Sequence, residues 1–286
     1  MTNSSIKTME NTISFSIIIP NKNRLTLLRR AVKSVLDQSY PNYEIIIVDD
    51  SSEDEFSTIV NEMEQNDKIR IIRGSGGGSA KARSIGYLKA RYPFVAFLDS
   101  DDYWSKDKLL YHAKAYSLYP EIVVCFDIWV SKDSNNQEFI YPPLDYMPGK
   151  IVKIRMADVH KELLRFNFIH ASAGSFKKCA LNEDFPPKEP QDYFTWLRLS
   201  TKGSFGVIGY QMSVKDIQTD SRGRNKKVLF EERINILREK VLLIKNYNIL
   251  SKHNRMRLLF FSITGFFINF FTLSDIVKKI MHLVSN

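Results

Sequence analysis

The stretch FVAFLDSDDYW, from Phe94 to Trp104, points to the fold because it places an apolar run directly before three aspartates and two aromatic residues. A short continuous apolar run bounded by polar residues is typical of a buried strand. Asp99, Asp101 and Asp102 repel one another when all three are ionised. A strand that ends on such a cluster is expected to serve either a turn and helix cap or a bound cation.

Asp99 and Asp101 form an Asp-x-Asp triplet, whose two carboxylates can face a divalent cation while diphosphate oxygens complete its oxygen shell. The structural alternative is a turn that leads into a helix. We expect Asp102 to cap the helix that follows, and Tyr103 and Trp104 to pack beside the site. Until a cation arrives, the repulsion predicts a loose cluster.

Upstream of this stretch, apolar runs alternate with segments of helical periodicity. The runs are continuous rather than alternating, which is typical of a parallel sheet covered by helices on both faces. Ligands of such sheets bind at the carboxyl ends of the strands, so the polar residues that follow the runs are expected on one rim. The predicted strands are 14–20, 44–50, 68–74 and 94–99, and the predicted helices are 25–37, 54–65 and 79–90.

Beyond residue 105 the pattern loosens, although helices and strands can still be placed. We expect helices at 106–118 and 156–165, a short one within QDYFTWLRLSTKG (191–203), and a long basic one at about 226–249. The stretch 121–130 is predicted as a strand, 131–138 as a hairpin turn and 170–178 as extended chain.

Composition favours one large domain with an appendage and an intracellular setting. The chain has 286 residues, 44% of them hydrophobic, which is enough for a full core. Two cysteines give no disulfide framework, and Cys125 in an apolar run predicts a buried, reduced thiol. The polar start, residues 1–13, lacks the features of a secretory signal, so we expect a cytoplasmic location.

The net charge of +9 is concentrated near the end of the chain, where eleven Lys and Arg face four Asp and Glu from Lys226 onward. Residues 255–283 are rich in Phe, with a narrow polar stripe that predicts a helix lying on an anionic membrane surface. The alternative is a helix packed on the catalytic domain or on a second subunit. A nucleic-acid-binding role is a rival reading of the charge, but we find no recognition motif for it.

The glycine-rich stretch GSGGGSAKAR (74–83) does not indicate an ATP-binding protein or a dehydrogenase. It lacks the Gly-Lys-Ser/Thr ending of a P-loop, and the first strand is followed by PNKNR rather than by the glycines of a dinucleotide fingerprint. Two interpretations stay open. The stretch is a flexible surface loop, or it is a loop that passes close to a bound nucleotide.

Several stretches in order closely resemble the family 2 inverting glycosyltransferases of the GT-A fold. They are FSIIIPNKNR, LLRRAVKSVLDQSYPNYEIIIVDDSSED, GGGSAKARSIGYLKA, FVAFLDSDDYW and QDYFTWLRL, and the match is strong over 14–110 and moderate over 165–202. The resemblance implies a GT-A catalytic domain at 14–220, with a nucleotide-binding half (14–104) and an acceptor-binding half (105–220). A basic amphipathic helical, membrane-associating region at 221–286 completes the expected organisation.

The resemblance also implies a nucleotide-sugar donor, with UDP as the family-typical carrier of glucose, galactose or their N-acetyl forms. Asp50 matches the aspartate that contacts the uracil ring, and Pro20 and Asn23 lie on the loop that walls the base. The implied donor-binding residues are Pro20, Asn23, Asp50, Arg83, Asp99, Ser100 and Asp101. Asp99 and Asp101 would bind Mn²⁺ or Mg²⁺, with Asp101 as the more direct ligand.

Asp192 matches the catalytic base of the family, which takes a proton from the acceptor hydroxyl. Tyr193 and Trp196 follow it and are expected to contact the acceptor sugar. The structural alternative for Asp192 is a helix N-terminal carboxylate stabilised by the helix dipole.

The chain departs from the family pattern at three places, where Gln191 replaces a glutamate, Ser84 an asparagine and Lys22 an aromatic residue. Glu189 is the second candidate base.

Bacterial enzymes of this kind often extend a saccharide carried on a polyprenyl diphosphate lipid. The resemblance therefore implies a role in O-antigen, capsule or other surface polysaccharide synthesis, on the inner face of the cell membrane. A non-catalytic sugar-binding or scaffold relative is the alternative, and the retention of Asp50, Asp99, Asp101 and Asp192 argues against it. The sequence does not indicate an oligomeric state.

Overall fold

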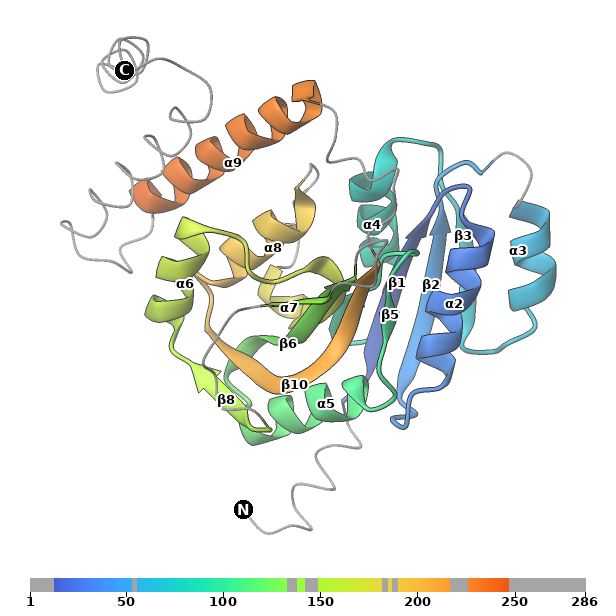
Figure 1. The fold of residues 1–286 in the computed structure, drawn as a ribbon, viewed down its shortest axis with the longest axis horizontal. Helices are drawn as coiled ribbons and strands as arrows, with labels where there is room; N and C mark the ends of the chain where they lie inside the picture. The colour runs from blue at the N-terminus through green and yellow to red at the C-terminus, as the bar shows by residue number, and fades with distance from the viewer. Residues whose placement is uncertain are drawn as a thin grey trace.

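The computed structural model describes residues 13–52, 56–132, 138–141, 149–181, 185–186, 190–216 and 226–246. They form an α/β fold around one ten-stranded mixed sheet, ordered β3-β2-β1-β4-β9-β6-β10-β5, with β7 beside β6 and β8 beside β10 (Figure 1). Four features predicted from the sequence lie at least partly outside the described residues: the N-terminal tail, the 131–138 turn, Glu189 and the Phe-rich stretch 255–283.

The first half of the chain has the predicted alternation of strands and helices. β1, β2, β3 and β4 are parallel to one another. Their continuous apolar sequences are explained by two buried faces: Ile17 and Ile19 of β1 join one core, and Ile18 joins the other. The elements are β1 (Phe15–Asn21), α2 (Leu25–Leu36), β2 (Tyr43–Asp49), α3 (Phe56–Met63), β3 (Ile69–Arg73), α4 (Gly78–Lys89) and β4 (Phe94–Phe97).

The second half extends the sheet with strands in both directions. β9 pairs antiparallel with β4 and β6, so a late segment of the chain lies against the last strand of the first half. The elements are β5 (Tyr103–Trp104), α5 (Lys108–Leu118), β6 (Ile122–Lys132), β7 (Glu138–Tyr141), β8 (Ile151–Ile154), α6 (Met156–Arg165), the 3-10 turn η1 (Ala171–Ala173), β9 (Gly174–Lys177), α7 (Lys178–Leu181), α8 (Gln191–Leu199), β10 (Ser204–Asp216) and α9 (Lys226–Asn246). The long strand β10 was not predicted.

Two layers of helices cover the sheet. Helices α2, α3 and α5 pack on one face, and α4, α6, α8 and α9 pack on the other. The described part of the chain contains no helix that is both long and apolar enough to cross a membrane.

Helix α9 packs against α6 and α8 (Figure 1). Leu243 and Ile244 are buried in the core, and Arg198 Nε of α8 lies 2.7 Å from Glu239 Oε1. Lys240 Nζ donates to the carbonyl of Arg165, 3.3 Å away, where a cation stabilises the C-terminal end of α6. Burial lowers the pKa of Lys240 to about 8.

A buried ionic cluster joins α5 to the strands of the second half. Lys108 pairs with Asp127, and its Nζ also donates to Ser213 Oγ and to the carbonyl of Ala173, each 3.1 Å away. Burial lowers the pKa of Lys108, although the charge of Asp127 opposes this shift. His112 contacts the same carboxylate, and burial together with the Lys108 charge lowers its pKa to about 4.

We expect Asp127→Ala to lower the free energy of unfolding by about 3–5 kcal/mol, because the change leaves the Lys108 ammonium buried without a counter-ion. The control is Asp37→Ala, which breaks the exposed Lys33–Asp37 pair and should cost about 1 kcal/mol or less. Urea denaturation of both variants measures the difference. Equal losses in the two variants would contradict the role assigned to the cluster.

Candidate active site

A cavity of about 720 Å³ opens at the carboxyl ends of β1, β2 and β4. All seven residues predicted to bind the donor line it, together with Lys215, which comes from β10 in the other half of the chain. The lining residues are Pro20, Asn21, Lys22, Asn23, Arg24, Asp50, Gly78, Ser79, Arg83, Asp99, Ser100, Asp101 and Lys215.

The glycine-rich loop is part of the cavity wall. Gly76, Gly77 and Gly78 have φ values of 77°, 127° and 84°, in the left-handed region that favours glycine. The amide of Gly78, the first residue of α4, donates to Asp50 Oδ2 at 2.8 Å. The end of this stretch lines the cavity through Gly78, Ser79 and Arg83, and its closeness to a bound nucleotide stays a prediction.

The two carboxylates of the Asp-x-Asp triplet are neutralised by arginines from the first half of the chain. Arg83 lies 2.5 Å from Asp99, and Arg24 pairs with Asp101. Burial would raise the pKa of Asp99, but the charge and the hydrogen bond of Arg83 outweigh it, and the pKa falls to about 2. The arginines offset part of the repulsion, but burial and then the charge of Asp99 still raise the pKa of Asp101. That the cluster tightens when a cation binds stays a prediction.

Asp102 does not cap a helix, which corrects the prediction made from the sequence. Helix α5 begins at Lys108, and its N-cap residue is Asp107. The buried Asp102 carboxylate instead accepts a hydrogen bond from Ser172 Oγ at 2.5 Å and from the amide of Asp216 at 3.3 Å. Burial, followed by the charges of Asp99 and Asp101, raises the pKa of Asp102 well above its usual range.

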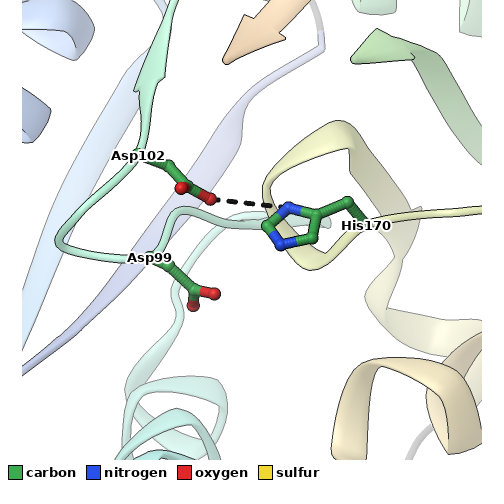
Figure 2. Close-up of side chains that lie close together, drawn as sticks. All are labelled: Asp99, Asp102 and His170. Atoms are coloured by element: carbon green, nitrogen blue, oxygen red, sulfur yellow. Dashed lines mark ion pairs between the residues drawn. The ribbon is translucent and has the colours of Figure 1, made fainter. Parts of the chain in front are cut away.

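Asp99, Asp102 and His170 form a group of possible metal ligands (Figure 2). One donor atom from each lies within 4.8 Å of the others, and His170 Nδ1 is 3.4 Å from Asp102 Oδ2. Two carboxylates and an imidazole fit a divalent ion, and the nitrogen donor favours Mn²⁺ over Mg²⁺. Burial lowers the pKa of His170 to about 3, so its ring is neutral and able to coordinate.

The sequence missed His170 and Lys215 because neither lies near the aspartate stretch along the chain. Both reach it through the placing of β9, β6 and β10 in the sheet beyond β4, which a single sequence does not reveal.

Asp192 lies in the first turn of α8, partly exposed and outside the cavity lining. Asn167 Nδ2 donates to its Oδ2 at 3.4 Å. The neighbouring Gln191 binds α8 to helix α4, since its Nε2 donates to the carbonyl of Ala80 at 2.9 Å and to Ser84 Oγ at 3.0 Å. Because α4 also carries Arg83, these bonds hold the start of α8 against a wall of the cavity.

Tyr193 and Trp196 do not face solvent, which corrects their assignment to the acceptor. Trp196 is fully buried, and its Nε1 donates to the carbonyl of Ile169 at 2.9 Å. Tyr193 is also buried, and its hydroxyl donates to the carbonyl of Leu163. Their spacing of three residues, followed by Leu197, is the apolar stripe of a helix that packs on a core, a signal present in the sequence.

A family model described as glycosyl transferase family 2 matches residues 16–178, more than half of the chain. The chain belongs to glycosyl transferase family 2. A solved structure of S. aureus TarS in complex with UDP-GlcNAc covers 86% of this chain and 70% of its own, with a TM-score of 0.69 at 18% identity. The likeness confirms the GT-A fold expected from the sequence.

Relatives in this family extend the comparison. The UDP-Glc:alpha-D-GlcNAc-diphosphoundecaprenol beta-1,3-glucosyltransferase WfaP of Escherichia coli is 30% identical over 189 residues, or 66% of this chain and 70% of WfaP. The putative teichuronic acid biosynthesis glycosyltransferase TuaG of Bacillus subtilis is 44% identical over 96 residues, or 33% of this chain and 38% of TuaG. An uncharacterized glycosyltransferase of Rickettsia conorii is 38% identical over 109 residues, and the match spans 18% of its length.

Two of the three departures from the family 2 pattern are in contact. Gln191 donates to Ser84 as well as to two backbone carbonyls, those of Ala80 and Pro186, the latter at 2.5 Å. A glutamate at 191 would place acceptor-only oxygens against these carbonyls. The Gln191 amide therefore contributes to the docking of α8 on α4.

We expect Gln191→Glu to lower the free energy of unfolding by about 1–3 kcal/mol, because a buried carboxylate would replace the amide donor and face the carbonyl oxygens of Ala80 and Pro186. Adding Ser84→Asn supplies an amide donor beside the new carboxylate and should recover part of the loss. Thermal unfolding of the single and double variants at neutral pH measures both effects. A single variant as stable as the parent chain would show that the amide does not hold α8.

Proposed function

We propose that this family 2 glycosyltransferase transfers a hexose from a UDP-sugar donor to a hydroxyl of a glycan acceptor, with inversion at the anomeric carbon. The observation that carries the proposal is the cavity at the carboxyl ends of the strands, where Asp50 and the Asp-x-Asp triplet meet two arginines. Its position is where open α/β sheets bind nucleotide ligands.

The residues of the cavity divide the donor between them. In this proposal the base binds to Asp50, which accepts a hydrogen bond from the Gly78 amide, and to Pro20 and Asn23 in the same cavity wall. Two sets of residues could hold a metal ion, and Asp99 belongs to both. The family resemblance implies Asp99 and Asp101, whereas the geometry groups Asp99 with Asp102 and His170. A bound divalent ion would supply positive charge for the diphosphate.

Asp192 serves as the general base in this proposal. As the acceptor oxygen attacks the anomeric carbon, Asp192 takes the hydroxyl proton, and the bond from that carbon to the diphosphate oxygen breaks. The electron pair of that bond leaves with the nucleoside diphosphate. A single displacement inverts the configuration. Asn167, whose amide donates to Asp192, would orient the carboxylate.

The acceptor proposed is a saccharide carried on a polyprenyl diphosphate lipid. The support comes from the relatives: the name of WfaP describes glucosyl transfer to GlcNAc-diphosphoundecaprenol, and TuaG bears a putative role in teichuronic acid biosynthesis. Such an acceptor would place this chain in the synthesis of O-antigen, capsule or another surface polysaccharide.

Asp192→Asn should keep donor binding and lose transfer by roughly 10²-fold or more, because the amide cannot accept the proton. UDP binding by calorimetry and product formation from UDP-sugar and acceptor would be measured on the same preparation. Asn167→Asp is a companion variant, expected to repel Asp192 and alter the pH profile without abolishing turnover. Normal turnover by Asp192→Asn would move the base elsewhere, with Glu189, outside the described residues, next in line.

We also propose that the enzyme lies on the inner face of the cell membrane through residues 255–283, which lie outside the described residues. The support is their Phe-rich, basic composition and the lipid-linked acceptor of WfaP. A chain ending at residue 250 should move from the membrane fraction to the soluble fraction after cell lysis. A truncated chain that stays fully in the membrane fraction would contradict the proposal.

Two experiments separate this function from its rivals. Donor hydrolysis screened across nucleotide sugars with Mn²⁺ would identify the sugar, and no hydrolysis of any would favour a non-catalytic sugar-binding relative. A salt-dependent gel shift with DNA would revive the nucleic-acid reading of the +9 charge.

A further inference from the structure

The cations that line the cavity differ in whether they are already paired. Arg24 and Arg83 each hold a carboxylate of the Asp-x-Asp triplet. Lys22 and Lys215 also line the cavity, and within the described part of the chain neither ammonium has a carboxylate at ion-pair distance. Lys22 is exposed on the loop after β1, whereas Lys215 is partly buried on β10. A partly buried cation in that state is available to an anionic ligand.

Lys215 is held in place by its neighbours on β10. The amide of the next residue, Asp216, donates to Asp102, and the Asp216 carboxylate lies 2.7 Å from Arg30. Ser213, which shares a face of the strand with Lys215, donates to the carbonyl of Ser172 at 3.1 Å. The lysine therefore projects toward the segment that holds Asp99 and Asp102.

The side chains around the Lys215 ammonium also restrict its conformation. Its Nζ lies 5.9 Å from the centroid of the Trp129 ring, and that indole donates to the carbonyl of Phe168. The charge of Lys215 lowers the pKa values of Asp99 and Asp102, secondary to burial and to nearer groups, so its field reaches the triplet.

The order of the strands in the sheet indicates which part of the donor would contact Lys215. Asp50 follows β2, Asp99 follows β4, and β10 lies further along the sheet in the same direction. A ligand whose base contacts Asp50 extends past β1 toward β4. Its far phosphate, the one that bears the sugar, then lies nearest to Lys215.

We propose that Lys215 binds the β-phosphate of the nucleotide-sugar donor, an inference that rests on the proposed function. When the bond from the anomeric carbon to the β-phosphate oxygen breaks, the electron pair stays on that oxygen and its negative charge grows. The Lys215 ammonium keeps its proton and offsets this charge, while the proton of the acceptor hydroxyl goes to Asp192. Lysine is a common phosphate ligand for this reason.

The test is calorimetry with the full chain, Mn²⁺ present, using UDP and UMP as probes. Lys215→Met removes the charge but keeps an unbranched stem against Trp129. It should weaken UDP binding roughly 10- to 100-fold, the range of a charged hydrogen bond, and leave UMP binding within about twofold. Lys215→Arg should recover most of the UDP affinity. The control is Lys202→Ala, which removes one exposed positive charge after α8 and should leave the affinities for UDP and UMP unchanged.

The outcomes separate the inference from the proposed function. If the parent chain binds UDP and Lys215→Met binds it equally well, the inference is overturned and the function stands. If Lys215→Met loses UDP and UMP equally, the lysine does not act at the β-phosphate, which also overturns the inference. If the parent chain binds neither nucleotide, both fail.

Discussion

Charge compensation at the end of β4 is the constraint on which the rest of the site depends. Three aspartates lie within four residues, and burial makes their mutual repulsion stronger than it would be in water. The fold meets this with separate partners. Arg83 pairs with Asp99, Arg24 pairs with Asp101, and Asp102 lies among hydrogen-bond donors from the second half of the chain. The chain's own side chains therefore compensate part of the negative charge at this edge of the cavity.

Ser172 is the residue through which the two halves of the chain meet at this point. Its hydroxyl donates to Asp102 and accepts from the amide of Asp99, 3.1 Å away. Its carbonyl accepts from Trp104 Nε1 at 2.8 Å and from Ser213. The ionic cluster of Lys108 and Asp127 lies behind it and fixes the adjoining Ala173 carbonyl. Stability and site geometry are thus coupled through one short segment.

The sequence was most informative where apolar runs are continuous. β1 to β4 and the rim at their carboxyl ends could be predicted because both faces of that part of the sheet are covered, so each strand carries a continuous apolar run. β10 could not, because its burial changes along its length and Gly206 and Gly209 interrupt it.

The site shows the same division between local and long-range information. The residues predicted to bind the donor line one cavity, and all of them except Arg83 of α4 lie at or just after the ends of predicted strands. Tyr193 and Trp196 were misassigned because their aromatic character was weighed above their helical spacing. Asp102, His170 and Lys215 acquire their roles from strands brought together by the sheet order, which local patterns do not contain. From the sequence, Gln191 and Ser84 are two unrelated differences from the family 2 pattern, and only the structure shows that they are hydrogen-bonded to each other.

The central claim is that the cavity binds a uridine diphosphate together with a divalent cation. A calorimetric titration of the full chain with UDP, once with Mn²⁺ and once with EDTA, tests this most directly. The account predicts binding that is at least tenfold tighter with the metal, because the cation screens the diphosphate from Asp99 and Asp101. UDP binding of equal strength in EDTA, or none in either buffer, would contradict it.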